Sequence, residues 1–282
     1  MNCNNFQQFT GLIRNSLKED IGKIDITTEL VIPKDKAVKA VLLAKEPCVV
    51  CGLGIAELAF KTQDAKIKFN PKTKDGDSVN KGKVLALVEG SVKSILTAER
   101  VALNFISLLS GVATKARQYA RAARPYKVKI IDTRKTIPGL RELQKYAVRT
   151  GGGYNHRMRL DTMILVKDNH LKAMESVQGL IGHAKKYKLE IEVKNLKEFR
   201  EALKLKPDII MLDNMGVKDI KKIIAIKKAL SRNVLQRIPE LEASGGITLQ
   251  NIKQIASTGV DMISVGALTH SVKSIDISLE IL

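Results

Sequence analysis

Short apolar runs alternate with helix-like segments over the C-terminal half of the chain. The runs are VKIID (128–132), TMILV (162–166), LEIEV (189–193), DIIML (208–212), ELEAS (240–244) and VDMISVG (260–266). Strands that alternate with helices form right-handed βαβ units, and successive units build a parallel sheet. Six units over about 150 residues predict an α/β barrel, complete or slightly short.

The N-terminal part of the chain has a different pattern. Phe9, Leu12, Ile13 and Leu17 are spaced as on one face of a helix, and a turn-rich segment follows up to Pro33. Three β-like runs come next, AVKAVLLA (37–44), AKIKF (65–69) and KVLALVEG (83–90). The stretch looks like half of a biotinyl or lipoyl carrier domain, but it lacks the exposed hairpin lysine of such a carrier. We therefore expect a small β-rich domain.

A long helix is predicted between these two parts, over residues 94–124. Its apolar positions recur every three or four residues, as expected for a buried stripe, at Ile95, Ala98, Ala102, Phe105, Ile106 and Leu109. Gly111 is predicted to break this helix. The expected domains are residues 1–112, on which a C-terminal helix could pack back, and residues 113–282, which form the barrel.

Polar residues follow nearly every predicted strand of the barrel. The strand ends carry Thr133, Arg134, Lys135, Lys167, Glu192, Asp213, Asn214, Gly245, Gly246, Gly266 and Ala267. In an α/β barrel the carboxyl ends of the strands share one mouth, where catalytic groups normally lie. A barrel that only had to fold would have no reason to repeat such residues there.

Basic residues are concentrated around the first two of these strand ends. Residues 126–170 contain ten Lys and Arg but only four Asp and Glu. Arg134, Arg157 and Lys167 lie at or near strand ends, and a guanidinium fork matches carboxylate or phosphate oxygens in pairs. The run RTGGGYNHR (149–157) could bring backbone close to a ligand, although His156 is equally compatible with a hydrogen-bonded core histidine. We predict a cationic pocket.

The last two predicted strands end in small residues. Ser244, Gly245 and Gly246 precede one helix, and Val265, Gly266 and Ala267 follow the next strand. Exposed backbone N–H groups at such junctions bind anions, and the last two loops of a barrel often hold a phosphate. Glu192 and Asp213 offer hard oxygen ligands for Mg²⁺ or for ribose hydroxyls. The pattern fits a phosphorylated sugar together with an anionic co-substrate.

Composition narrows the class of partner. The 282 residues include 48 Lys and Arg against 29 Asp and Glu, a net charge of +19, which favours nucleic acid, a membrane surface or a polyanionic small substrate. Aromatic residues make up only 4% and Trp is absent, so stacking platforms for single-stranded nucleic acid are few. No apolar run approaches the roughly 18–20 residues of a membrane span. We expect neither nucleic acid nor membrane as the partner.

The N-terminus and the cysteines bear on the compartment. The opening MNCNNFQQFTGLIRN lacks the features of a secretory signal, so we expect a cytoplasmic protein. Cys48 and Cys51 have the spacing of a redox dithiol or of half a zinc site, but no second pair completes such a site. The two intervening valines suit a strand, so structural thiols are favoured over redox or metal chemistry.

Longer motifs go beyond these patterns. They are DTRKTIPGLR (132–141), GGGYNHRMRLDTMILVKDNH (151–170), MLDNM (211–215), EASGGI (242–247) and DMISVGALTHS (261–271), with EDIGKIDITT (19–28) and AERVALNFISLLSG (98–111) towards the N-terminus. In this order they closely resemble quinolinate phosphoribosyltransferase, the carboxylating nicotinate-nucleotide pyrophosphorylase family, nearly from end to end.

The resemblance implies a fold and a reaction. The subunit would contain an N-terminal α/β sandwich and an incomplete α/β barrel of the triosephosphate isomerase type. It would form a homodimer, or a higher oligomer of dimers, in which one N-terminal domain caps the partner's barrel. The reaction would be that of a decarboxylating glycosyltransferase: quinolinate and 5-phosphoribosyl-1-pyrophosphate give nicotinate mononucleotide, CO₂ and pyrophosphate, with Mg²⁺, in de novo NAD biosynthesis.

The resemblance also implies roles for individual residues. Quinolinate would be bound by Thr133 and by the catalytic residues Arg134, Lys135, His156, Arg157 and Lys167, with Arg100 reaching across the dimer. The phosphoribosyl substrate would contact Glu192, Asp213, Ser244, Gly245, Gly246, Val265, Gly266 and Ala267, and Glu192 and Asp213 would hold Mg²⁺. Lys194 stands where a second acidic residue is expected, which weakens the expectation for the local metal contacts.

Two alternatives stay open at this point. A related phosphoribosyltransferase of the same fold could act on another aromatic acid, although Arg134 and Arg157, with His156 and Lys167, favour a dicarboxylate. The net charge of +19 is also compatible with a basic nucleic-acid-binding protein, whose binding would fall steeply with salt.

Overall fold

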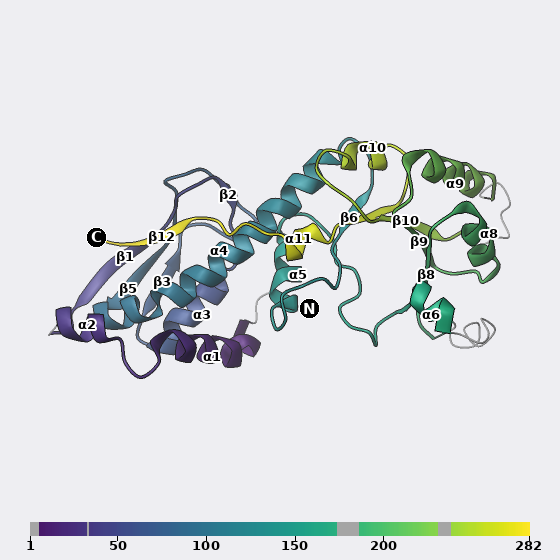
Figure 1. Cartoon of the computed structure of the whole chain (residues 1–282). Coiled ribbons are helices and arrows are strands. Elements are labelled where there is room, and N and C mark those ends of the chain that lie inside the picture. Colours follow the sequence, from purple (N-terminus) through teal and green to yellow (C-terminus); the bar gives the residue numbers. More distant parts are fainter. Residues whose placement is uncertain (1–5, 33, 174–185, 231–237) are drawn as a thin grey trace. The chain divides into compact units, whose positions relative to one another are not determined.

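The computed structural model describes residues 6–32, 34–173, 186–230 and 238–282. The chain divides into two compact units, each assembled from segments distant in sequence. Unit 1 comprises residues 1–115, 146–151 and 272–282. Unit 2 comprises residues 116–145 and 152–271. Figure 1 shows the two units along the chain.

Unit 1 is an α/β sandwich built on a four-stranded antiparallel sheet with strand order β12-β1-β5-β3. The strands are β1 (Ala37–Ala44), β3 (Lys68–Pro71), β5 (Val84–Ser91) and β12 (Ile277–Ile281). A short separate pair joins β2 (Cys48–Val49) to β4 (Ser78–Val79). The three predicted β-like runs are confirmed as strands, the second of them displaced towards Pro71 because residues 65–67 lie in the turn that follows a helix.

The predicted C-terminal helix is wrong, because the C-terminal residues form β12. This strand pairs antiparallel with β1, with Leu42 opposite Leu279 and Ala44 opposite Ile277. The segment carries Ile275, Ile277, Leu279 and Ile281 at every second position, which is the period of a strand and not of a helix. The chain end therefore completes the first sheet.

Helices cover the sheet of unit 1. They are the 3₁₀ helix η1 (Phe6–Phe9), α1 (Thr10–Ile21), α2 (Ile26–Val31), α3 (Leu53–Gln63) and the first part of α4 (Val92–Ala122). The predicted N-terminal helix is confirmed as α1, with Ile13 and Leu17 buried. The segment expected to be only turns contains α2, because Asp25 caps it by accepting a hydrogen bond from the N–H of Thr28 at 3.0 Å.

The long helix α4 is confirmed, and its apolar stripe from Ile95 to Leu109 is buried. Among the described helices, α4 is the one long and apolar enough to cross a membrane, with a mean hydropathy of 1.4 in its most apolar window. However, 61% of that window is buried inside the protein, which is typical of a core helix.

Gly111 does not break α4, contrary to the prediction. A Cβ atom at this position would lie 2.3 Å from the carbonyl oxygen of Lys273 and 2.9 Å from a side-chain carbon of Val272. The glycine therefore lets the backbone of the C-terminal segment pass directly over the helix, and the helical hydrogen bonds continue through it.

Replacement of Gly111 by alanine is expected to destabilise the protein, because the new Cβ atom would meet backbone that cannot rotate away. The matched control is Gly11→Ala in α1, where no atom lies within 4 Å of the new Cβ atom. Alanine there gains about 1 kcal/mol of helix propensity. Thermal unfolding should therefore show a lower Tm for Gly111→Ala and an unchanged or higher Tm for Gly11→Ala. Equal Tm values would contradict the close approach.

The two internal cysteines of unit 1 are buried free thiols. Cys48 lies in β2, as the two valines suggested. Burial raises the pKa of Cys48 to about 11 and raises that of Cys51 further above its usual range, with a contribution from the charge of Asp75. Thiols that stay protonated are poor nucleophiles and poor metal ligands, which supports the interpretation as structural residues.

Unit 2 contains a six-stranded parallel sheet with strand order β6-β11-β10-β9-β8-β7. The strands are β6 (Lys129–Ile131), β7 (Ile164–Val166), β8 (Leu189–Val193), β9 (Ile209–Asp213), β10 (Glu240–Ser244) and β11 (Met262–Ser264). All six predicted strands are confirmed. In the described residues β6 and β7 end the order and do not pair with each other, so the barrel is incomplete, as expected.

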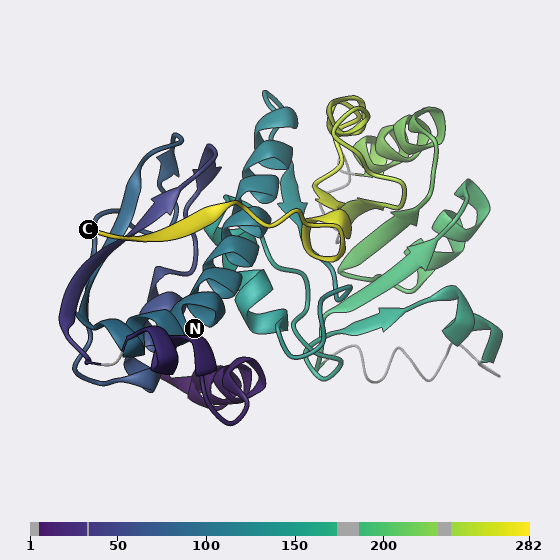
Figure 2. The same ribbon diagram turned by 60° about the vertical axis from the view of Figure 1, so that its left-hand side comes forward.

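The helices of unit 2 connect these strands. They are the end of α4, the start of α5 (Arg141–Thr150), α6 (Asp168–Ala173), α8 (Leu196–Lys204), α9 (Val217–Leu230), α10 (Ile252–Ala256) and α11 (Ala267–His270). Helices α8, α9 and α10 lie along one side of the strands (Figures 1 and 2). Because all six strands are parallel, their carboxyl ends lie at a common edge of the sheet.

Candidate active site

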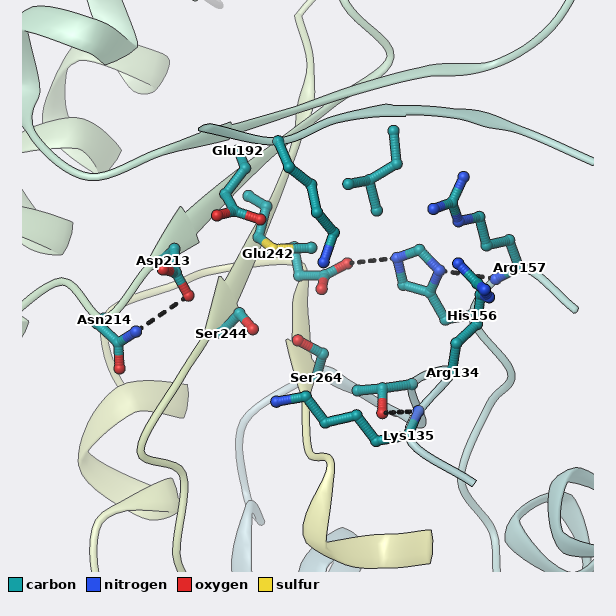
Figure 3. Close-up of a pocket in the computed structure, with 14 residues that line it drawn as sticks. Arg134, Lys135, His156, Arg157, Glu192, Asp213, Asn214, Glu242, Ser244 and Ser264 are labelled. Atoms are coloured by element: carbon teal, nitrogen blue, oxygen red, sulfur yellow. Dashed lines mark hydrogen bonds and ion pairs between the residues drawn. The ribbon is translucent and has the colours of Figure 1, made fainter. Parts of the chain in front are cut away.

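A cavity of about 500 Å³ opens at the carboxyl ends of the strands of unit 2, within the usual size range of small-molecule sites. All of its lining residues belong to unit 2. They are Thr133, Arg134, Lys135, His156, Arg157, Leu165, Lys167, Glu192, Met211, Asp213, Asn214, Glu242, Ser244 and Ser264. The strand ends predicted to share one mouth therefore do so (Figure 3).

One side of the cavity carries positive charge. Arg134 and Lys135 follow β6, Arg157 belongs to the loop before β7, and Lys167 follows β7. Arg157 is held in place because its guanidinium donates a hydrogen bond to the carbonyl oxygen of Met163 at 2.9 Å. Burial and the nearby charge of Arg134 lower the pKa of Arg157, but an arginine stays protonated at neutral pH.

The Nε atom of Arg134 is buried and has no hydrogen-bond acceptor among the residues that the structure describes. A buried, unsatisfied guanidinium donor is costly unless a ligand supplies the acceptor. The cationic side of the cavity is therefore arranged for an anion.

The opposite side of the cavity carries oxygen donors. Glu192 lies on β8, Asp213 ends β9 and Ser244 ends β10 (Figure 3). Glu192 is in register with Met211, so Asp213 comes two residues further along the neighbouring strand, on the same face. Two carboxylates beside an open cavity match the needs of Mg²⁺, which binds through one or two carboxylates and keeps positions for water and substrate phosphates.

His156 lies between the two sides, against two buried glutamates. Its Nε2 atom is 3.0 Å from Oε2 of Glu190 and 3.5 Å from Oε2 of Glu242. Its Nδ1 atom accepts a hydrogen bond from the backbone N–H of Arg157 at 2.7 Å (Figure 3). Because Nδ1 is an acceptor, the neutral ring carries its proton on Nε2, the ring atom nearest to the two glutamates.

The donor atoms of His156, Glu190 and Glu242 all lie within 4.8 Å of one another, close enough to surround a metal ion. The hydrogen bond at Nδ1 argues against such an ion. A neutral imidazole that binds a metal through Nε2 carries its proton on Nδ1 and would face the N–H of Arg157 with a second donor. The cluster instead requires protons to offset its two carboxylates.

Glu242 is the group in this cluster with the clearest electrostatic perturbation. Burial raises the pKa of Glu242 well above its usual range, and the neighbouring Glu190 raises it further. Two buried carboxylates this close cannot both ionise cheaply. The protonated form of Glu242, which can donate a hydrogen bond, is therefore favoured by its surroundings.

Glu242→Gln is expected to raise the Tm at neutral pH. In the unfolded chain the Glu242 carboxyl ionises near its ordinary pKa of 4.5, so folding loses stability as the pH rises above that value. Glutamine does not titrate. The gain in Tm should be absent near pH 4 and grow as the pH rises above 4.5, by about 2–4 °C for each kcal/mol gained in the free energy of unfolding. Glu240→Gln, at the exposed start of the same strand, is the control. A gain in Tm that does not change with pH would contradict the raised pKa of Glu242.

The glycine-rich strand ends were predicted to bind phosphate. In the structure, the first of these two strand ends lies beside the cavity. Gly245 has a φ of +90° and leaves no room for a Cβ atom, which would lie 2.2 Å from Oδ1 of Asn214. Gly246 also has a positive φ, of +60°. Both lie beside the cavity behind Ser244 but do not line it.

The second predicted phosphate loop lies next to Lys135. The N–H of Val265 donates to the carbonyl oxygen of Ile131 at 2.9 Å, so this group is used in the sheet. A Cβ atom on Gly266 would be 3.3 Å from Cδ of Lys135. Gly266 and Ala267 are half-buried at the start of α11. None of the three lines the cavity.

Two further residues lie away from the cavity. Arg100 is exposed on the part of α4 that belongs to unit 1. Lys194, the departure from the family pattern, is exposed at the end of β8 and does not line the cavity. Glu192 and Asp213 therefore line the cavity without Lys194 between them.

Glu242 and Ser264 line the cavity although they were not predicted as site residues. A signal for both was present, because Glu242 stands two residues before Ser244 and Ser264 two residues before Gly266. Alternate residues of a barrel strand face the same side. Leu165 and Met211, also unpredicted, supply the apolar part of the lining.

The chain matches two family models over almost its whole length. Residues 25–110 match the model described as the quinolinate phosphoribosyl transferase N-terminal domain. Residues 112–280 match the model of the C-terminal domain of the same family.

Similar proteins and structures agree with these models. A protein of Methanocaldococcus jannaschii named "Probable nicotinate-nucleotide pyrophosphorylase [carboxylating]" is 44% identical over 96% of both chains. A Nicotiana tabacum protein named "Quinolinate phosphoribosyltransferase [decarboxylating] 1b" is 41% identical over 96% of this chain and 81% of its own length. The solved nicotinate-nucleotide pyrophosphorylase of Francisella tularensis is 40% identical with a TM-score of 0.90, covering 98% of this chain and 96% of that one. The chain belongs to the quinolinate phosphoribosyltransferase family.

Proposed function

We propose that the cavity of unit 2 carries out the reaction of this family. The enzyme transfers the phosphoribosyl group of 5-phosphoribosyl-1-pyrophosphate to quinolinate with decarboxylation, and releases nicotinate mononucleotide, CO₂ and pyrophosphate in NAD biosynthesis. The observation that carries the assignment to this cavity is its division into a side with four cationic residues and a side with two carboxylates.

The cationic side is the proposed quinolinate site. Quinolinate carries two adjacent carboxylates, so its site must neutralise a dianion. Arg134, Lys135, Arg157 and Lys167 supply that charge, with Thr133 and His156 beside them. Each charge-assisted hydrogen bond contributes about 1.5–3 kcal/mol. The unsatisfied Nε atom of Arg134 is a donor for one of these bonds.

The carboxylate side is the proposed site of the phosphoribosyl group and of Mg²⁺. Glu192 and Asp213 would hold the ion, and Ser244, which also lines the cavity, would contact the sugar. The phosphate would reach past the cavity lining to the backbone of Gly245, Gly246, Gly266 and Ala267. The bound Mg²⁺ would neutralise the pyrophosphate that leaves.

We further propose direct displacement at the ribose carbon by the ring nitrogen of quinolinate, without a covalent enzyme intermediate. The new bond makes a pyridinium ring. The carboxylate beside the nitrogen then leaves as CO₂, and the electron pair of the broken bond stays on that ring carbon, stabilised by the adjacent cationic nitrogen. The same carbon takes up a proton from solvent to give nicotinate mononucleotide. The cations of the quinolinate site hold the carboxylates in a fixed orientation while this charge develops, which is electrostatic preorganisation.

The assembly we propose is a homodimer in which Arg100 of one subunit reaches the cavity of the other. Arg100 is exposed, and unit 1 also exposes large apolar side chains in and near α2, namely Ile24, Ile26, Leu30 and Val31. Such a cluster is typical of a protein–protein contact. We also propose a cytoplasmic enzyme that acts on small molecules and binds neither nucleic acid nor membrane.

The test supplies purified protein with 5-phosphoribosyl-1-pyrophosphate, Mg²⁺ and one acceptor at a time: quinolinate, nicotinate or nicotinamide. Nicotinate mononucleotide and CO₂ should form when quinolinate is the acceptor, and no product should form with nicotinate or nicotinamide. Turnover of another acid but not of quinolinate would overturn the dicarboxylate assignment and leave the phosphoribosyl side in place. Omission of Mg²⁺ with a chelator should stop the reaction.

A further inference from the structure

An ion pair outside the cavity connects the two loops that carry its cations. The side chains of Asp132 and Lys145 are both 0% exposed and form a direct salt bridge within unit 2. Asp132 immediately precedes the Thr133–Lys135 segment, and Lys145 lies on α5. Neither residue lines the cavity.

The pair is hydrogen-bonded to the backbone of the second loop. Oδ1 of Asp132 accepts from the N–H of His156 at 2.9 Å, and Nζ of Lys145 donates to the carbonyl oxygen of His156 at 3.0 Å. Nδ2 of Asn155 donates to Oδ2 of Asp132 at 2.5 Å and to the carbonyl oxygen of Lys145 at 2.9 Å. Both backbone polar groups of His156 are therefore held by this pair.

The neighbouring residue on α5 anchors the first loop. Oε1 of Gln144 accepts from the N–H of Ile137 at 2.9 Å, and Nε2 of Gln144 donates to the carbonyl oxygen of Thr269 at 2.8 Å. Oγ1 of Thr269 in turn donates to the carbonyl oxygen of Lys135 at 2.7 Å. Two successive buried residues of α5 thus tie the Arg134–Lys135 segment and the His156–Arg157 segment to one helix.

Stability alone is a poor reason for such a pair. Removing two charges from water costs several kcal/mol each, and apolar side chains of similar size often replace a buried ion pair without loss. Burial raises the pKa of Asp132 and lowers that of Lys145, so desolvation disfavours the charged form of both groups despite their attraction. What apolar replacements could not supply is the three side-chain bonds to Asn155 and His156, because the fourth bond is accepted by the backbone carbonyl of Lys145.

We propose that Asp132 and Lys145 are positioning residues that set the spacing between the Arg134–Lys135 and Arg157 cations, and thereby the fit of the two carboxylates of quinolinate. This inference rests on the proposed function of the cavity. A displacement of about 1 Å in a positioned group can cost a factor of about 10² in rate. The phosphoribosyl side, built on β8, β9 and β10, is independent of the pair.

The main test compares the wild-type enzyme with the double variant Asp132→Asn, Lys145→Met, which removes both charges and leaves no buried ion unpaired. We expect the KM for quinolinate to rise at least tenfold, with the KM for 5-phosphoribosyl-1-pyrophosphate unchanged within about twofold. The matched control is Lys227→Met, which breaks the partly buried pair with Asp261 in the same unit. It should lower the Tm and leave both KM values unchanged.

A milder variant keeps the test decisive if the double variant does not fold. Asn155→Ala leaves the ion pair intact and removes two of the bonds around it. We expect a rise of about threefold or more in the quinolinate KM and a lower Tm, because two buried acceptors lose their donor. A wild-type quinolinate KM in either folded variant would overturn the positioning role. Absence of quinolinate turnover by the wild-type enzyme would instead overturn the proposed function, and the inference with it.

Discussion

Arg157→Ala is expected to lower kcat/KM for quinolinate by about 10²- to 10³-fold, comparable to the removal of one preorganised donor from a catalytic site. Arg157 lines the cationic side of the cavity, and its hydrogen bond to Met163 fixes its guanidinium before a substrate arrives. Lysine at this position would restore the charge but not the planar fork. Steady-state kinetics with quinolinate as the varied substrate measures the loss.

The control for this prediction is Arg159→Ala. Arg159 stands two residues further along the same loop, but its side chain is 63% exposed and pairs with the equally exposed Asp161. Exposed pairs of this kind contribute about 0–1 kcal/mol, so this variant should keep wild-type kinetics and a wild-type Tm. Equal losses in both variants, or none in Arg157→Ala, would contradict the placement of the quinolinate site.

Asp213→Asn is expected to reduce activity by a similar factor for a different reason. Asparagine keeps the shape of the side chain but removes the charge that we propose for Mg²⁺ binding beside Glu192. Weaker metal binding removes several kcal/mol of stabilisation from the departing pyrophosphate, about 10²- to 10³-fold in rate. The dependence of the rate on Mg²⁺ concentration should shift upwards, and the KM for quinolinate should change little.

Asp219→Asn is the matched control for this variant. Asp219 lies near the start of α9, 51% exposed, in an exposed pair with Lys222, and does not line the cavity. We expect no change in the Mg²⁺ dependence. An unchanged Mg²⁺ dependence in Asp213→Asn would remove this residue from the proposed metal site, and quinolinate binding by the same variant would show that the cationic side is intact.

Local patterns were sufficient for the parallel sheet of unit 2. Each strand there is a short apolar run bounded by turn residues. In the connecting helices, apolar residues recur every three or four positions. The polar residues at the strand ends were equally visible, because the strand end defines where a side chain can reach the mouth of a barrel. Arg134, Arg157, Lys167, Glu192 and Asp213 accordingly line one cavity.

The errors arose where a distant segment decides the local structure. Gly111 looks like a helix terminator, but it continues α4 because the backbone at Lys273 crosses over it. The C-terminal segment is a strand because β1 has a free edge for it. Neither partner can be read from the residues around the glycine or at the chain end.

The buried ionisable residues also depend on contacts between segments that are distant in sequence. Glu190, Glu242, Asp132 and Lys145 are each buried completely, although such residues are usually exposed. Their burial follows from pairing: Lys145 compensates Asp132, and Nε2 of His156 lies 3.0 Å from Oε2 of Glu190 and 3.5 Å from Oε2 of Glu242. Charge pairs between residues far apart in sequence leave no periodic signal along the chain.

The sequence by itself determined the order of the strands in unit 2, the cationic and acidic residues at the strand ends, and the family that these motifs identify. These features depend on short-range periodicity and on residue types whose chemistry does not change with context. Only the tertiary structure decided that Glu242 is a buried acid, that His156 carries its proton on Nε2, and that α5 ties two cation-bearing loops together. Proton positions and loop spacing depend on burial and on contacts between distant segments, which exist only once the chain has folded.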